Sequence, residues 1–189
     1  MTSNAGITDT DVIDVLTGDH REARELANQI SATADPDDRR ELTDQLIAEL
    51  VRHSVAEEMY VYPAMRDHLP DGEQAVEHDI EEHKQLETLM KQLESADAGT
   101  TEFEDALRSL QQVLVDHVQD EEIEQFPQLR AHVPAATLIE LKEKVETAKK
   151  LAPTRPHPAA PNAELFHKLV GPGVGLVDRL RDKLTGRST

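Results

Sequence analysis

The chain of 189 residues contains no cysteine and no tryptophan, and aromatic residues make up only 3% of it. Without cysteine the chain forms no disulfides, iron–sulfur clusters or thiolate zinc sites. It has no apolar run long enough to cross a bilayer, and its first residues lack the basic start and apolar stretch of a signal peptide. These absences predict a cytoplasmic protein without a membrane partner.

Basic residues are scarce relative to acidic ones, with 20 Lys and Arg against 38 Asp and Glu and a formal net charge of −18. Such a charge repels the phosphates of nucleic acids and the headgroups of anionic lipids, so no nucleic acid partner is expected. The chain also has no glycine-rich phosphate loop and no nucleophile elbow, which argues against turnover of an organic substrate.

Leu, Ala, Glu and Gln, all good helix formers, are abundant. Apolar residues recur at steps of three or four, which predicts four long helices. The first should span about residues 9–31, the second should begin at Asp35-Pro36, the third should follow the break at 69–72, and the fourth should open with a capping box of Thr101 and Glu104. Long helices with short loops predict an all-α, antiparallel up-down-up-down four-helix bundle over residues 9–133.

Beyond the bundle, the sequence predicts an additional helix at 134–151 and then a Pro-rich linker with a short amphipathic tail at 152–189. A tail that packs along the bundle or dangles is favoured over a membrane or partner-binding helix, because the amphipathic stretch is short. A protein partner for the tail stays open.

An internal repeat carries the chemistry. The segment 53–70 recurs without a gap as 117–134, and in both copies a His is followed by two Glu, four and five positions later. A lone His precedes each copy: His20 lies 33 residues before His53, and His83 lies 34 before His117. The chain is therefore two copies of one unit, in which a helix with a lone His precedes a helix with His-x-x-x-Glu.

Residues four apart on a helix share a face, so both His-x-x-x-Glu pairs and both lone His reach the bundle axis. The six residues placed there are His20, His53, Glu57, His83, His117 and Glu121. Burying them without partners would cost several kcal/mol per group, which favours a metal site over an inert core. Imidazole with carboxylate suits iron, manganese or zinc, and two related units predict two metal ions bridged by Glu57 and Glu121.

This pattern resembles the hemerythrin family, specifically the HHE cation-binding domains. The resemblance covers about Val12 to Val133 and rests on Asp19-His20-Arg21, on His53-x-x-x-Glu57-Glu58 with Tyr62-Pro63, on Glu82-His83, and on His117-x-x-x-Glu121-Glu122 with Phe126-Pro127. It implies a helical bundle with a non-haem di-iron centre, in which an oxo or hydroxo bridge joins two iron ions and the six residues above are the ligands.

Two departures from the oxygen carriers of the family leave alternatives open. Those proteins have a His four positions before the lone His of the third helix, where this chain has Asp79, next to His78. The fifth imidazole is thus supplied by His78, replaced by Asp79, or absent. On the fourth helix, Glu121 matches the internal repeat, whereas Glu122 has the spacing that the oxygen carriers use.

Tyr60 lies three residues after Glu57, which predicts that it shares the inward face. A core tyrosine is favoured there over a phenolate ligand or an outer hydrogen-bond donor to iron. The resemblance implies a protein that binds or senses a small ligand, namely peroxide, oxygen or nitric oxide, with catalase-like decomposition of peroxide as a candidate activity. The alternative is an iron-binding protein that buffers the metal without turnover.

Overall fold

The computed structural model describes residues 10–152, and within this range the protein is helical with no strand, so the all-α prediction is confirmed. The α-helices are α1 (Val12–Ala32), α2 (Pro36–Ala56), α3 (Tyr62–His68), α4 (Gly72–Ser95), α5 (Thr101–Asp120), α6 (Phe126–His132) and α7 (Ala135–Leu151). Two π-helical turns, η1 (Glu57–Val61) and η2 (Glu121–Gln125), join α2 to α3 and α5 to α6 without a break. The predicted Pro-rich linker and tail lie outside the described residues, apart from Ala152.

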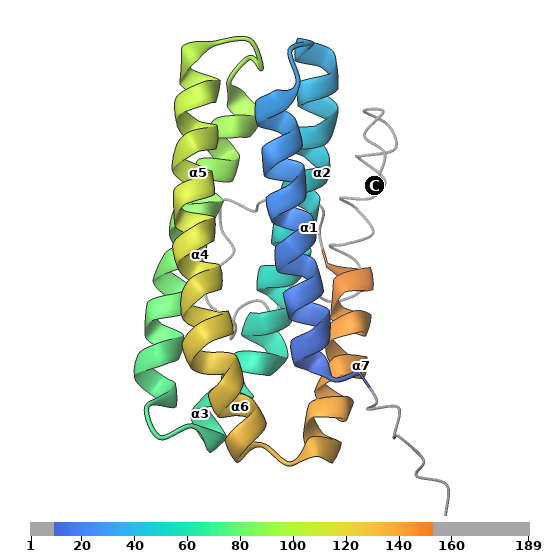
Figure 1. The fold of residues 1–189 in the computed structure, drawn as a ribbon, viewed down its shortest axis with the longest axis vertical. Helices are drawn as coiled ribbons and strands as arrows, with labels where there is room; N and C mark the ends of the chain where they lie inside the picture. Colours follow the sequence, from blue (N-terminus) through green and yellow to red (C-terminus); the bar gives the residue numbers. More distant parts are fainter. Residues whose placement is uncertain (1–9, 153–189) are drawn as a thin grey trace, which may run out of the picture.

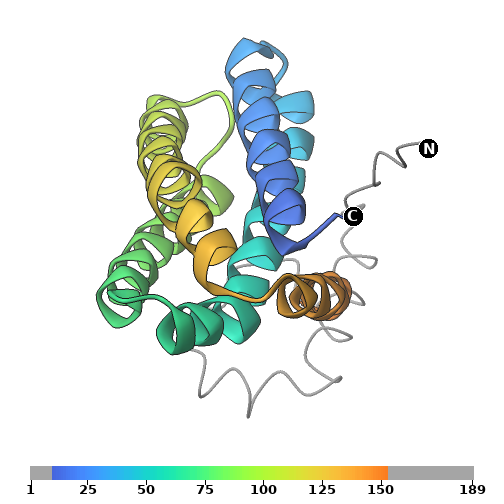
Figure 2. The same ribbon diagram turned by 60° about the horizontal axis from the view of Figure 1, so that its bottom comes forward.

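Four rods form the bundle: α1, α2 with α3, α4, and α5 with α6 (Figure 1). The chain turns at one end between α1 and α2 and between α4 and α5, and at the other end between α3 and α4. α1 packs on α2, and α4 packs on α5. α7 lies outside the four rods against α1 and α2 (Figure 2), so the two sides of the bundle have different surroundings.

Three of the long helices, α1, α2 and α5, begin where a side chain satisfies free backbone N–H groups. Asp11 caps α1 in a capping box with Asp14, so this helix begins three residues later than expected. Asp35 caps α2 and Pro36 opens it, as predicted. The capping box expected at Thr101 was wrong, because Thr100 is the N-cap of α5 and its side chain accepts from the Phe103 N–H.

The two π turns lie at equivalent places of the two repeats, just before Pro63 and Pro127. Proline has no N–H to donate to the carbonyl four residues earlier, and its ring clashes with that carbonyl. In both copies the turn widens instead, and the N–H of the preceding residue donates to the carbonyl five residues back, at Glu57 and at Glu121. Each π turn contains one more residue than a regular helical turn. Beyond each glutamate, the positions that face inward therefore come one residue later than in a regular α-helix.

The apolar core is divided into two clusters with a polar layer between them. One cluster includes Ile30, Leu46, Leu93 and Phe103, and the other includes Leu16, Met65, Val76 and Phe126. On each of the four rods the predicted metal-binding residues lie between the part that enters the first cluster and the part that enters the second. Packing above and below therefore fixes the height of these side chains.

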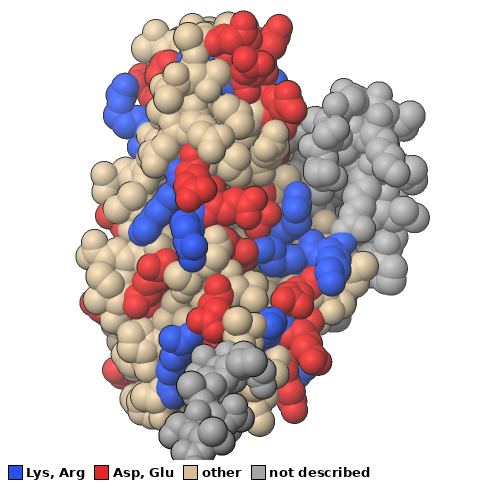
Figure 3. All heavy atoms as spheres, turned by 45° about the vertical axis from the view of Figure 1, so that its right-hand side comes forward, with Lys and Arg blue, Asp and Glu red and all other residues tan. Residues whose placement is uncertain are grey.

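The outer surface carries both signs of charge. On the side where α1 and α7 lie, Lys and Arg side chains gather at mid-height among Asp and Glu (Figure 3). None of the described helices is both long and apolar enough to span a bilayer.

Candidate metal centre

All six residues predicted at the bundle axis are buried and come together in the polar layer. They are His20 on α1, His53 on α2, Glu57 at the start of η1, His83 on α4, His117 on α5 and Glu121 at the start of η2. The sequence repeat therefore corresponds to a spatial one, with one lone His and one His-x-x-x-Glu pair from each half of the chain.

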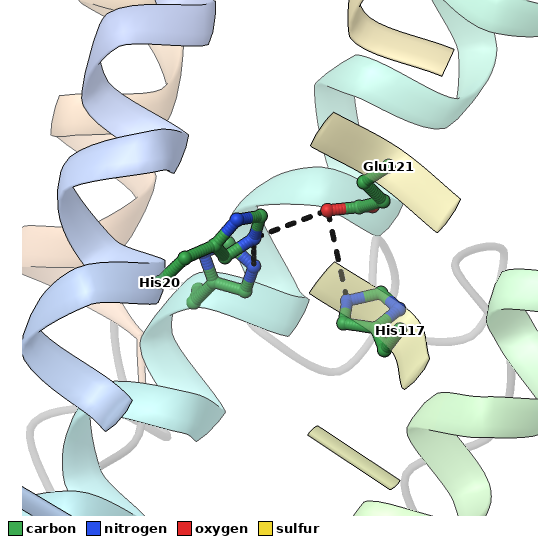
Figure 4. A group of neighbouring side chains, drawn as sticks. His20, His117 and Glu121 are labelled. Carbon is green, nitrogen blue, oxygen red and sulfur yellow. Dashed lines mark hydrogen bonds and ion pairs between the residues drawn. The ribbon is translucent and has the colours of Figure 1, made fainter. Parts of the chain in front are cut away.

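Glu121 lies between imidazoles of the two repeats. Its Oε2 is 3.1 Å from His20 Nε2 and 3.7 Å from His117 Nε2 (Figure 4). His53 completes this group, because His53 Nε2 is 3.2 Å from His20 Nε2. One ligand atom from each of these four residues lies within 4.8 Å of all the others, which is close enough to surround one metal ion.

Glu57 takes the equivalent place in the other repeat. Its Oε2 is 3.0 Å from His53 Nε2 on its own rod and 3.4 Å from His83 Nε2 on the neighbouring rod α4. Glu57, His83 and His117 form a second group of ligand atoms within 4.8 Å of one another. Each glutamate thus faces the His of its own His-x-x-x-Glu pair and the lone His of the other repeat.

Several of these buried polar atoms lack a hydrogen bond. Both carboxylate oxygens of Glu57, the Oε2 of Glu121 and the Nε2 of His117 have no hydrogen-bond partner, although imidazole and carboxylate lie close together. Such orphaned atoms are rare in folded proteins because leaving them unpaired is costly. Carboxylate oxygens and imidazole nitrogens that converge without bonding one another fit a cation between them.

A carboxylate lies against the Nδ1 atom of every imidazole of the centre. The four pairs are His20 with Glu122 at 2.9 Å, His53 with Asp19 at 3.3 Å, His83 with Glu58 at 3.1 Å and His117 with Glu82 at 3.0 Å. This contact holds the proton on Nδ1 and leaves Nε2 free to face the axis, as at many metal sites. The sequence reasoning missed these roles, although the signal was present: an acidic residue before each lone His and a second Glu after each bridging candidate.

The carboxylates also set the charge of the imidazoles. Burial opposes the charged form of His83, but the nearby carboxylates of Glu57 and Glu58 outweigh it and raise the pKa of His83 to about 10. Burial likewise opposes the charge of His53, yet Glu57 and Asp19 raise its pKa well above the ordinary value. Burial would raise the pKa of Glu57, but the charge of His53 holds it well below its usual range. The centre therefore attracts positive charge strongly.

The two repeats differ beside these common residues. Tyr62 is buried next to His83, with its hydroxyl 3.1 Å from His83 Nε2, whereas its counterpart Phe126 stacks on His20 at 5.7 Å between ring centroids. Tyr60, the tyrosine expected on the inward face, packs half-buried against the apolar cluster instead. The π turn explains the change, because it moves the inward position from Tyr60 toward Tyr62.

The structure also distinguishes the open alternatives. His78 is exposed on α4 and pairs with Asp120 at 3.2 Å, so it does not reach the axis. Asp79 is fully buried and accepts a hydrogen bond of 2.8 Å from Gln125. Burial raises the pKa of Asp79 to about 7, and the negative charge of Glu121 adds to this effect. Glu122 is partly exposed and faces His20 Nδ1 from outside the centre.

A small cavity adjoins the centre on the side of the first apolar cluster. His20, His53 and His117 line it together with Leu50, Leu86 and Leu114, and it has room for little more than a water molecule. A ligand that reaches the centre from this side must be very small.

Comparison with known proteins explains the repeated pattern. The profile of the Hemerythrin HHE cation binding domain matches residues 11–129, which is more than half of the chain. The chain belongs to the hemerythrin HHE family. An uncharacterized hemerythrin-like protein of Schizosaccharomyces pombe is 31% identical over 176 residues, which cover 93% of this chain and 87% of that protein.

Two further similarities cover most of the chain. The crystal structure of a hemerythrin HHE cation binding domain-containing protein from Mycobacterium kansasii superposes with a TM-score of 0.66 at 24% identity, over 91% of this chain and 98% of that one, and shows the same fold. A protein of Nostoc named DNA nickase is 28% identical over 130 residues, which cover 69% of this chain but only 36% of that protein.

Proposed function

We propose that the protein is a non-haem di-iron protein whose centre reacts with peroxide. The observation that carries this proposal is the pair of buried glutamates, Glu57 and Glu121, each of which lies against two imidazoles and has a carboxylate oxygen without a hydrogen-bond partner. Ligands of nitrogen and oxygen without sulfur suit iron, and membership of the hemerythrin HHE family supports iron over manganese and zinc.

The division of ligands follows the spatial repeat. His53, Glu57 and His83 would hold one iron ion, and His20, His117 and Glu121 would hold the other. Each carboxylate would be able to contact both ions, because each lies between an imidazole of its own repeat and one of the other repeat. Two neighbouring iron ions would together accept or donate two electrons, which the two-electron oxidation or reduction of a small molecule requires.

Peroxide is favoured over reversible oxygen binding by the polar groups on one side of the centre. Asp79 is a buried carboxyl at the position where the oxygen carriers of the family have an imidazole, so the centre has one imidazole fewer. The carboxylates of Glu57 and Glu121 are then a larger share of the ligands, and anionic oxygen ligands stabilise the ferric state, which disfavours a reversible ferrous carrier. The hydroxyl of Tyr62 keeps its proton, because burial and the charges of Glu57 and Glu121 raise its pKa well above 10, and it can donate a hydrogen bond beside His83.

In the proposed reaction two molecules of hydrogen peroxide give two molecules of water and one of oxygen. One peroxide loses two electrons and two protons, and the other gains them as its O–O bond breaks, so no further oxidant or reductant is needed. The residues of the chain orient the metal ligands, and the adjoining cavity, with room for little more than a water molecule, limits access from its side to very small molecules. Sensing of nitric oxide or peroxide at the same centre would use the same access.

Stopped-flow mixing of the anaerobically reduced protein with oxygen, together with an oxygen-electrode assay with hydrogen peroxide, tests the proposal. We expect oxygen evolution from peroxide and irreversible oxidation by oxygen. A stable oxy-adduct that releases oxygen under vacuum would contradict the proposal. Iron that exchanges readily with a chelator, without peroxide turnover, would point instead to iron buffering.

A further inference from the structure

A second group of potential metal ligands lies on the outer face of α4 and α5. His78 Nε2 is 3.2 Å from Asp120 Oδ2 and 3.5 Å from Glu82 Oε1, and ligand atoms of these three residues lie within 4.8 Å of one another. The His78 side chain is 56% exposed and that of Asp120 is 39% exposed, so the group opens to solvent. One imidazole and two carboxylates are ligands that suit a divalent cation.

Glu82 connects this outer group with the buried centre. Its Oε1 faces His78, whereas its Oε2 is 3.0 Å from His117 Nδ1. The side chain of Glu82 is only 11% exposed, so it forms the inner wall of the outer group. The carboxylate thus lies between a surface imidazole and an imidazole of the centre.

Asp79 belongs to the next group of potential ligands on the way from the surface to the centre. Ligand atoms of Asp79, Glu82 and His117 also lie within 4.8 Å of one another. Gln125 donates to one oxygen of Asp79, but the other oxygen, Oδ2, is fully buried and has no hydrogen-bond partner. An unpaired, buried carboxylate oxygen at this depth is costly unless a cation visits it.

The three groups of potential ligands therefore form a continuous series from the solvent to the buried centre, because neighbouring groups share a residue. The outer group shares Glu82 with the middle group, and the middle group shares His117 with the inner group of Glu57, His83 and His117. We infer that divalent metal ions reach the buried centre through the α4–α5 face, where His78, Glu82 and Asp120 capture the cation before Asp79 receives it. This inference rests on the proposed metal centre but concerns how the centre is loaded.

Among the described residues, the opposite face of the bundle lacks a comparable series of ligand groups from solvent to the centre. In the sequence repeat the counterparts of His78, Asp79 and Asp120 are Val15, Leu16 and Ala56, all apolar. On that face the carboxylate of Asp19, which contacts His53 Nδ1, accepts a hydrogen bond from the Lys149 ammonium of α7. The Nζ of Lys149 is also 2.8 Å from Glu49 Oε1. A fixed ammonium at this point repels an incoming cation, and Figure 3 shows basic side chains over the middle of the face that α1 and α7 share.

The test follows metal uptake in the full chain after removal of metal by a chelator. Cobalt(II) is the probe, because its visible absorption changes when imidazole and carboxylate replace water, and stopped-flow mixing gives the rate. We expect the double variant H78A/D120A to load at least about tenfold more slowly, since steering by charge raises capture rates by such factors. The final cobalt content should equal that of the unaltered protein.

The double variant D67A/H68A is the matched control, because it removes the same two side chain types from the exposed end of α3. It should load at the normal rate. Asp120→Lys, which places a cation at the outer group, should slow loading further and weaken its dependence on salt.

Equal loading rates for H78A/D120A and the control would overturn the inference while leaving the centre intact. Loss of final cobalt content in H78A/D120A without a slower rate would also overturn it, because these residues would then support the centre itself. If the unaltered protein takes up no cobalt and no iron, the proposed function fails together with the inference.

Discussion

The half of the bundle formed by α1 and α2 and the half formed by α4 and α5 carry the same metal-binding residues in different surroundings. In both halves a lone His faces the buried glutamate of the other repeat, and a carboxylate lies against each Nδ1. These features recur because each repeat must hold half of one centre. They are the part of the site that duplication alone accounts for.

The differences lie beside the centre rather than in it. Tyr62, Asp79 and Gln125 border it on one side, where the repeat has Phe126, Leu16 and Val61 on the other. Under the proposed function, the residues common to both halves would hold metal, whereas the residues that differ would govern access and reactivity.

The largest effect should come from removing Glu57 or Glu121, which take equivalent positions in the two repeats. Glu57→Ala and Glu121→Ala should each lower the metal content from about two ions per chain to one or fewer, since each removes a ligand that lies between the repeats. Glu122→Ala should keep most of the metal, because Glu122 contacts only His20 Nδ1. Metal analysis after gel filtration measures this, with exposed Glu124→Ala as the control. If Glu122→Ala empties the centre and Glu121→Ala does not, the assignment on η2 is wrong.

The turns before α4 and before α7 lie at equivalent positions of the two repeats, but they are packed differently. A Cβ on Gly72 would lie 2.1 Å from the Met65 carbonyl oxygen, whereas the counterpart Ala136 is exposed. Gly72→Ala should therefore reduce the free energy of unfolding by about 2–3 kcal/mol. Ala136→Gly should cost less than about 1 kcal/mol. Urea unfolding compares the two variants, and equal costs would show that the corners are packed alike.

Asp79 has no charged counterpart, so its charge should destabilise only this half of the metal-free protein. Its folded-state pKa of about 7 exceeds the ordinary 3.8, which means that folding favours its protonated form and is penalised as the pH rises from 3.8 through 7. Asp79→Asn should raise the free energy of unfolding at pH 8 by up to a few kcal/mol and much less at pH 4.5. Urea unfolding of the metal-free variant, with exposed Asp67→Asn as the control, measures this. A gain that does not depend on pH would contradict the explanation.

The smallest expected effect concerns the Tyr62 hydroxyl. Tyr62→Phe makes this half resemble the other, where Phe126 stacks on His20. Loss of the contact with His83 should lower the free energy of unfolding of the metal-free protein by about 1 kcal/mol. Tyr60→Phe, at a half-buried position, is the control and should change little. Equal effects of the two variants would mean that the hydroxyl of Tyr62 has no special role beside His83.

Much of the fold and the centre could be predicted from the sequence, because helix periodicity fixes which residues face inward as long as the helix is regular. His20, His53, His83 and His117 lie where the stripes of three and four place them. The periodicity no longer predicts the inward residues beyond Glu57, because the π turn shifts the inward positions. As a result Tyr62, and not Tyr60, lies beside His83. Nothing in a regular spacing shows such a turn, although Pro63 and Pro127 mark the places where a regular helix cannot continue.

The sequence indicates the outer carboxylates, because an acidic residue precedes each lone His, but it does not show which imidazole each one contacts. Asp19 and Glu82 each lie next to a lone His in the sequence, yet each contacts the His of a neighbouring rod. Such pairings depend on how the rods are rotated against one another. The role of Lys149 depends on where α7 docks, which no repeat in the chain indicates.

The central claim is that two half-sites together hold two iron ions. Iron analysis of protein purified from iron-replete cells, combined with the visible spectrum after oxidation in air, tests it most directly. We expect about two iron atoms per chain and an absorption band of an oxygen-bridged ferric pair, which reduction removes. One metal ion per chain, or zinc in place of iron, would contradict the account.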